Sequence, residues 1–154
     1  MKFYSFIVAL ALTFLFTGCS KKEQGAHKVH FDRDMCERCK MVISDRNYVA
    51  QIVENNRAYN FDDIGCALLW LDKKPPEWQK RAKFYIADSK SGEFIDMAIA
   101  HWSSGHTTPM DYGIGASKDA KGEGEISFED VKKRIHAIKE KRMQSSIRGS
   151  MQHE

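Results

Sequence analysis

The chain has 154 residues, a formal net charge of +3 and a hydrophobic share of 42%, which suits one ordinary globular domain and excludes a disordered or fibrous chain. Its 24 basic and 21 acidic side chains are interspersed, so the composition does not indicate a nucleic-acid-binding protein. The sequence has neither a glycine-rich phosphate loop nor a Gly-x-Ser-x-Gly motif, and we therefore expect no enzyme activity.

Residues 1–18 have the pattern of a secretory signal peptide. Lys2 supplies the positive end, and the apolar run 3–16 is shorter than a helix needs to cross a bilayer comfortably. The run ends at Thr17-Gly18-Cys19, which resembles a bacterial lipobox. We expect lipidation of Cys19, with an uncleaved anchor as the alternative. Either outcome holds the protein on the periplasmic side of a bacterial membrane.

The rest of the chain divides into three predicted parts. Residues 19–34 are mainly polar, with little to bury, and predict a lipidated tether. Residues 35–143 carry the apolar periodicity of a folded domain. Residues 144–154 carry no pattern and predict a flexible tail.

The domain is predicted to begin with a β-hairpin. Residues 41–43 and 48–53 are rich in β-branched and aromatic side chains, and 57–61 alternate as a return strand. Asn55-Asn56 supply the conformations that a tight turn needs. This hairpin would hold residues 36–41 at its edge.

A helix follows, and its limits are clearly marked. Asp62 or Asp63 can cap it, Ile64 and Leu68 recur at helical spacing, and Pro75-Pro76 stop it. Cys66 lies in its first turns, where a cysteine is more often a small core residue than a metal ligand.

The second half predicts another hairpin, a long loop and a second helix. Residues 83–87 and 93–97 are the expected strands, and residues 98–121 are the expected functional loop. Ser127 is the expected N-cap of a helix that runs to roughly Lys141. The whole pattern indicates an α+β fold with a mainly antiparallel sheet or sheets and two helices, or two small βα units.

The most informative motif is Cys36-x-x-Cys39-x-Met41. Thiolate and thioether ligands at such close spacing select soft ions such as Cu(I). Arg38 and Lys40 flank the thiols, and their positive charge favours the thiolate form that binds metal.

Cysteine number supports a site of this kind. With Cys19 taken by lipid, Cys36, Cys39 and Cys66 remain, and an oxidising compartment tends to pair thiols. A disulfide framework would leave one thiol over, so a redox pair or a metal site is favoured.

Further candidate ligands lie in the predicted loop. Met110 follows a proline and precedes flexible glycines, which is not the usual setting of a core methionine, so it is either a metal ligand or a hydrophobic plug. His101 and His106 belong to the same segment and can also contribute. The predicted metal site therefore contains Cys36, Cys39, Met41 and Met110, with Cys66 and the two histidines as additional candidates.

These motifs together resemble the NosL family of copper-binding lipoproteins. The resemblance rests on the lipobox, Cys36-x-x-Cys39-x-Met41, residues 60–66 leading into a Trp-bearing helix, and Thr108-Pro109-Met110 ahead of a Gly-x-Gly. It covers most of the mature chain. Lys40 and Asp111 stand where the family commonly has glycine.

The resemblance implies a function and partners. It implies a copper-binding domain over 35–143, a fold of two small βα units, and an accessory protein of denitrification. Such a protein would carry Cu(I) to apo nitrous oxide reductase and dock on an ABC-type transporter assembly complex.

Two other classes remain open from the residues alone. Cys36 and Cys39 could form the redox pair of a thiol-disulfide oxidoreductase, although such a motif normally begins a helix after a strand. Alternatively, Cys36, Cys39, Cys66 and a histidine could hold a structural zinc ion that the domain needs to fold.

Overall fold

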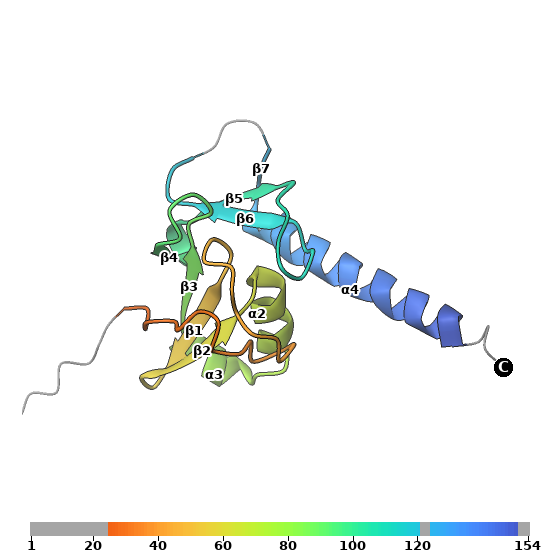
Figure 1. The fold of residues 1–154 in the computed structure, drawn as a ribbon, viewed down its shortest axis with the longest axis horizontal. Helices are drawn as coiled ribbons and strands as arrows, with labels where there is room; N and C mark the ends of the chain where they lie inside the picture. Colours follow the sequence, from red (N-terminus) through yellow and green to blue (C-terminus); the bar gives the residue numbers. More distant parts are fainter. Residues whose placement is uncertain (1–24, 121–123, 151–154) are drawn as a thin grey trace, which may run out of the picture.

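The computed structural model describes residues 25–120 and 124–150. It is an α+β fold with two antiparallel sheets (Figure 1), which confirms the predicted fold class. The predicted signal peptide and the lipid-attachment residue Cys19 lie outside the described residues. Within the described part of the chain, no helix is long and apolar enough to cross a membrane.

The first sheet contains the two predicted hairpins. Its strands are β1 (Ala50–Glu54), β2 (Arg57–Phe61), β3 (Lys83–Ala87) and β4 (Phe94–Asp96), in the order β2-β1-β3-β4, and all neighbours are antiparallel. The β1–β2 turn is made by Asn55 and Asn56, with φ of 48° and 62°, as predicted. The first predicted strand, 41–43, is wrong, because only an isolated bridge between Met35 and Val42 forms there.

Helix α2 (Ile64–Leu71) follows β2 and is buried on most sides. Asp63 is its N-cap, and its side chain accepts a hydrogen bond from the backbone N–H of Cys66. The helix ends before Pro75, as predicted. Pro76 does not merely stop it but begins a short helix α3 (Pro76–Arg81), because proline fits the first turn, where its missing N–H has no partner to lose.

The second sheet places two strands inside the predicted loop at 98–121 and leaves residues 105–113 as the loop between them. After the 3₁₀ turn η2 (Met97–Ile99), strands β5 (His101–Ser104), β6 (Ile114–Ser117) and β7 (Glu125–Ile126) pair in the order β6-β5-β7. The serines and glycines of β5 and β6 have low strand propensity, which hid the strands. Burial of Trp102, Ile114 and Ala116 compensates for it.

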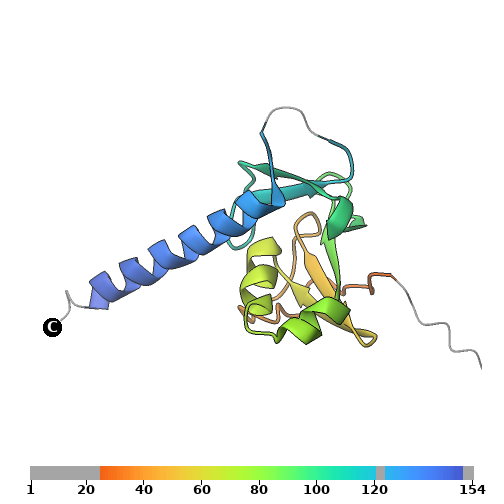
Figure 2. The same cartoon turned by 180° about the vertical axis from the view of Figure 1, so that it is seen from behind.

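Helix α4 (Phe128–Ser150) begins where the sequence predicted, with Ser127 Oγ accepting the N–H of Asp130 at 3.1 Å. Its first half packs on the core through the buried Val131 and Ile135. The second half extends away from the sheets (Figures 1 and 2), although Arg142 still hydrogen-bonds to the carbonyls of Met110 and Asp111. The predicted flexible tail is therefore helical over 144–150, because an established helix propagates readily; residues 151–154 lie outside the description.

The domain extends further toward the N-terminus than residue 35. Gln51 is fully buried on β1, and its side-chain amide exchanges hydrogen bonds with the backbone of His27, at 2.6 and 3.0 Å. Val29 is buried, and the backbone N–H of Asp32 donates to the carbonyl of Ile43 at 2.9 Å. The described part of the predicted tether, from about residue 27, is thus part of the domain.

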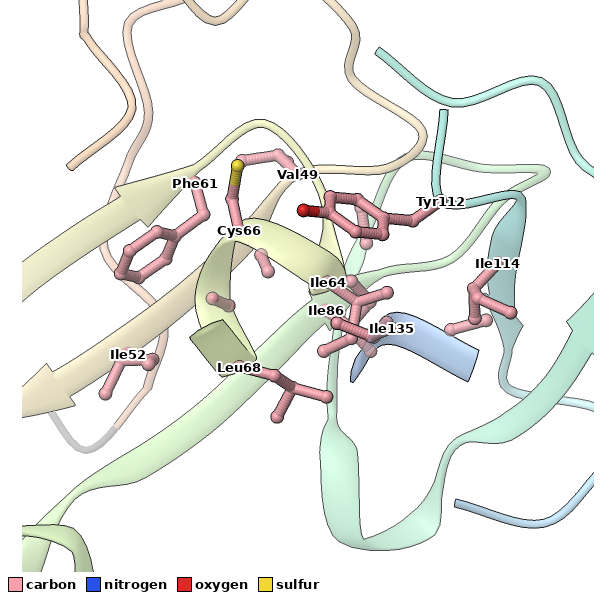
Figure 3. Packing of buried hydrophobic residues seen from close by; sticks show 14 of the residues in the cluster. Val49, Ile52, Phe61, Ile64, Cys66, Leu68, Ile86, Tyr112, Ile114 and Ile135 are labelled. Carbon is pink, nitrogen blue, oxygen red and sulfur yellow. The ribbon is translucent and has the colours of Figure 1, made fainter. Parts of the chain in front are cut away.

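One hydrophobic core joins the two sheets. Figure 3 shows α2 at its centre, with Phe61 on one side and Ile114 and Ile135 on the other. At the far end of β3, Asp88 connects the sheets, because its carboxylate accepts the backbone N–H of Lys90 and Ser91 in its own turn and that of Lys118 after β6. The core therefore fixes α2 against β2, where the cysteines lie.

Candidate metal centre

The first two cysteines lie in a tight turn at the edge of the first sheet. The N–H of Cys36 donates to the carbonyl of Met41 at 2.8 Å, and the N–H of Lys40 donates to the carbonyl of Cys36 at 3.0 Å. The N–H of Glu37 donates to the carbonyl of Asn60 on β2 at 2.9 Å. The β1–β2 hairpin thus holds the motif at its edge, as the sequence predicted.

The third cysteine comes from α2. Cys66 lies in the first turn of the helix, immediately after the strand whose edge holds the motif. The sulfur atoms of Cys36, Cys39 and Cys66 all lie within 4.8 Å of one another, an arrangement that can hold a metal ion. Cys66 is thus both a buried core residue and a member of the sulfur cluster.

The three sulfurs differ in exposure and in charge. Cys36 and Cys66 are fully buried, whereas Cys39 is half-buried. A hydrogen bond from the Cys66 thiol lowers the pKa of Cys36 to about 5, despite the opposing effect of burial. The same hydrogen bond, together with burial, raises the pKa of Cys66. This hydrogen bond therefore favours the thiolate form at Cys36 and the thiol form at Cys66.

Asp62 accepts a hydrogen bond from the thiol of Cys39 and so favours its protonated form. Burial and the hydrogen bond from Cys39 Sγ to Asp62 Oδ2, at 2.9 Å, raise the pKa of Cys39 to about 12. Burial also raises the pKa of Asp62. A metal ion that binds all three sulfurs must displace the protons of Cys39 and Cys66, so metal binding releases protons.

Arg38 supplies positive charge on the buried side of the cluster. Its Nη1 lies 3.8 Å from the sulfur of Cys66, whose pKa is nevertheless raised, so the thiolate form at Cys36 is favoured mainly by the hydrogen bond from Cys66 and not by this contact. Lys40 points elsewhere and pairs with Glu37 at 3.2 Å on the surface. Only Arg38 of the two flanking cations therefore contacts a cysteine sulfur.

The two predicted methionine ligands are placed differently from each other. The Met41 carbonyl closes the cysteine turn, and its side chain is 53% exposed. Met110 is half-buried and packs against the core. Its N–H donates to Asp63 Oδ2 at 3.3 Å, so the Met110 segment is tied to the N-terminal cap of the helix that carries Cys66.

The histidines are not part of the sulfur cluster. His101 Nδ1 pairs with Glu125 at 2.8 Å on the second sheet. His106 hydrogen-bonds to the hydroxyls of Tyr48 and Ser103 through its two ring nitrogens, at 3.3 and 2.9 Å. Within residues 25–120 and 124–150, no histidine or carboxylate joins the three sulfurs at this mutual distance.

A second layer of residues closes the site from the side of the β5–β6 loop. The Thr108 hydroxyl donates to Asp63 Oδ2 at 2.9 Å. The Tyr112 ring lies against Gly65, where any side chain would overlap it, and its hydroxyl end is directed toward Cys66 (Figure 3). From the sequence, Asp62 was predicted only as a possible helix cap and Tyr112 had no predicted role. Their closeness in the chain to Cys66 and Met110 is the signal that could have identified them.

The comparisons with known proteins add no assignment, because no family model matches the chain and no curated protein matches its sequence. Fold and site together define a small α+β protein with a three-cysteine cluster that can hold a metal ion.

Proposed function

We propose that this protein is a membrane-anchored, extracytoplasmic Cu(I)-binding metallochaperone that delivers copper during the maturation of nitrous oxide reductase. The observation that carries the metal-binding part is the meeting of three cysteine sulfurs from two separate elements, the 36–41 turn and α2. The copper cargo, the reductase as recipient and the transporter complex as partner are supported by the resemblance of the motifs to the NosL family.

Ligand chemistry supports copper as the cargo. Three sulfurs without a nitrogen or oxygen ligand at the same mutual distance, among the described residues, suit a soft monovalent ion of low coordination number. A structural zinc site uses four ligands in a closed tetrahedron. The cluster is one ligand short of that arrangement.

Exposure supports transfer of the ion. Cys39 is half-buried, while Cys36 and Cys66 are fully buried. A partner ligand can therefore approach the ion beside Cys39 before the buried sulfurs release it. Met41 is exposed at the end of the turn and is proposed as an additional sulfur ligand of the ion during this exchange. Met110, from the β5–β6 loop, is proposed as a further sulfur ligand of the ion.

The redox alternative has one feature in its favour, the pKa of about 5 at Cys36. A low pKa is typical of reactive thiols. However, Cys36 is fully buried, and the motif lies in a turn rather than at the start of a helix. The geometry therefore favours metal binding over thiol-disulfide exchange.

An anaerobic metal titration tests the proposal. The reduced full chain in detergent micelles is titrated with Cu(I) and, separately, with Zn(II) against competing chelators of known affinity, while circular dichroism follows folding. We expect one tightly bound Cu(I) per chain and a domain that is folded without metal. Preference for zinc with metal-dependent folding would overturn the proposal, and so would binding of neither ion.

Single substitutions then assign the ligands. Cys36→Ser, Cys39→Ser and Cys66→Ser should each lower Cu(I) affinity by more than about 100-fold. Loss of a residue that only supports a metal ligand lowers affinity by at most about that factor, so a larger loss identifies a direct ligand. His101→Gln is the control that should change nothing. Met41→Leu and Met110→Leu keep the side-chain volume and test the thioethers separately. An unchanged affinity in Cys66→Ser would remove α2 from the site.

A further inference from the structure

A second concave site lies beside the cysteine cluster, between it and the projecting half of α4. It is a cavity of about 390 Å³, lined by Arg38, Tyr112, Lys139, Arg142, Met143 and Ser146. Arg38 comes from the cysteine turn and Tyr112 from the loop that covers α2, while the other four residues belong to α4. The cavity therefore joins the metal centre to the most exposed element of the fold.

All the charged side chains that line this cavity are cationic. They are Arg38, Lys139 and Arg142, and no carboxylate lines the cavity. The nearest acid of Arg142 is Asp111, at 3.9 Å and with a side chain that is 93% exposed. Three like charges around one concavity repel one another unless an anion lies between them. The cavity thus has the electrostatics of an anion-binding site.

Arg142 is already held in place for such a role. Its Nη2 donates to the carbonyls of Met110 and Asp111 at 2.9 and 3.2 Å, and its guanidinium lies 4.8 Å from the centroid of the Tyr112 ring. A guanidinium fixed in this way loses little freedom when it binds a carboxylate through its planar fork.

The cavity and the metal centre share two walls. Arg38 lines the cavity and also places Nη1 3.8 Å from Cys66 Sγ. Tyr112 lines the cavity and packs against Gly65, the residue before Cys66. A carboxylate bound in the cavity is therefore separated from a cysteine sulfur by a single side chain.

We propose that this cavity is the docking site for an acidic segment of the protein that exchanges metal with the cysteine cluster. An Asp or Glu side chain of the partner would enter between Arg38, Lys139 and Arg142, with the exposed Met143 in contact with its apolar part. The inference rests on the proposed function, and it adds the position and the chemistry of the partner contact.

The shape of the site favours a protein partner over an anionic membrane surface. Arg38 is half-buried at the junction of the turn and α4, where a protruding side chain can reach it and a flat bilayer cannot. The cations that a bilayer would meet are those outside the cavity, such as Lys141 and Arg148, which are exposed and do not line it.

Binding of a hexaglutamate peptide to the full chain in uncharged detergent micelles tests the proposal. Fluorescence anisotropy is measured at low ionic strength, where charge screening is weak. Lys139→Glu/Arg142→Glu should lower peptide affinity by more than about tenfold. The matched control, Lys141→Glu/Arg148→Glu, makes the same charge change on the same half of α4 and should bind within about twofold of the unaltered protein. Lys139→Glu alone, which disturbs no anchoring contact of Arg142, serves if the double variant unfolds.

The other outcomes overturn the proposal. Equal losses in the two double variants would indicate general attraction to a basic helix. If binding to phosphatidylglycerol vesicles requires Lys139 and Arg142 while peptide binding does not, the cavity is a membrane site. If inorganic phosphate binds as tightly as the peptide, the cavity holds an adventitious ion only. Cu(I) affinity is measured in parallel and should stay unchanged in Lys139→Glu and in the control double variant, neither of which touches the Met110 segment that Arg142 anchors, so failure of docking remains distinct from failure of copper binding.

Discussion

The two halves of the domain have similar architecture but treat their candidate ligands in opposite ways. The first sheet carries α2 and the cysteine turn, and the second sheet with its β5–β6 loop carries α4 and the two candidate histidines, His101 and His106. In the first half, the sulfur atoms of Cys36, Cys39 and Cys66 lie next to one another. In the second half, His101 is paired with Glu125, and both ring nitrogens of His106 contact hydroxyls.

This difference shows that residue type and loop position do not by themselves define a metal ligand. The His106 ring also packs against Gly115, where any Cβ would overlap it, so it is a structural residue of the second sheet. The cysteine sulfurs, in contrast, exchange hydrogen bonds mainly with one another and with Asp62. A metal ion can replace those protons without dismantling the surrounding fold.

Two carboxylates of the first half, Asp63 and Asp88, nevertheless bind it to the second half. Asp63 ties the Met110 loop to the N-terminus of α2, and Asp88 ties β6 to the end of β3. If the comparison is correct, changes at these residues should weaken the fold more than they weaken metal binding.

Asp63→Ala should give the larger effect on stability. The substitution removes the α2 N-cap and leaves the buried Thr108 hydroxyl and the Met110 N–H without their acceptor. A lost cap costs about 1 kcal/mol, and the buried unpaired Thr108 hydroxyl costs about 1–3 kcal/mol, whereas the part-buried Met110 N–H can turn to water. We therefore expect a loss of about 2–4 kcal/mol in the free energy of unfolding, measured by urea denaturation of the metal-free protein.

Asp63→Asn is the matched control, because asparagine caps helices well and retains one acceptor oxygen. It should lose less stability than Asp63→Ala. Equal losses in the two variants would show that the charge of Asp63, rather than its hydrogen bonds, holds the two halves together. A Cu(I) affinity that falls as far as in Cys66→Ser would break the division between a binding half and a supporting half.

Much of the first half was predictable from the sequence because its signals are local. The Asn55-Asn56 turn, the Asp63 cap and the strand at 83–87 each depend on residues next to one another in the chain. The second sheet was missed because its strands contain serine and glycine and form only when Trp102 and Ile114 are buried by distant elements.

The candidate site was predicted only in part for the same reason. Cys36 and Cys39 are neighbours in the sequence, so their pairing could be inferred directly. The participation of Cys66 depends on how α2 packs against β2, and its apolar neighbours indicated a core residue instead. The occupation of both histidines by Tyr48, Ser103 and Glu125 is likewise a tertiary property.

Asp88 allows the link between the sheets to be tested by pH. Burial raises the pKa of Asp88, but hydrogen bonds from three backbone N–H groups and the Ser117 hydroxyl lower it by more than burial raises it. The resulting pKa is about 2. This value is below the roughly 3.9 of an unfolded chain, so the ionised form stabilises the folded state. That stability, about 2 kcal/mol, is present above pH ~4 and is lost as the pH falls toward ~2.

Asp88→Asn should therefore lower the unfolding free energy by about 2 kcal/mol at neutral pH and flatten its decline between pH ~4 and ~2. Chemical denaturation at a series of pH values measures both effects. Asp119→Asn, at an exposed position in the segment that follows β6, is the control and should follow the unaltered protein. A steep acid decline that persists in Asp88→Asn would assign it to other carboxylates and remove Asp88 as the main link.

The smallest expected effect concerns the cysteine turn itself. Lys40 has a φ of 63°, a left-handed conformation that costs a residue with a Cβ about 1 kcal/mol or more and costs glycine little. Glycine is also the residue that NosL-like sequences commonly have there. We expect Lys40→Gly to raise the free energy of unfolding by about 0.5–1 kcal/mol, measured by urea denaturation.

Lys40→Ala separates backbone strain from charge, because both variants lose the exposed pair with Glu37 and only glycine relieves the positive φ. Alanine should therefore give no gain. Asp111, with a φ of 55° in the β5–β6 loop, is the counterpart in the second half, and Asp111→Gly should gain less than Lys40→Gly because aspartate tolerates this conformation better than lysine. A larger gain at Asp111 would place the greater strain in the supporting half and reverse the comparison, since the strained turn should be the one that carries the cysteines.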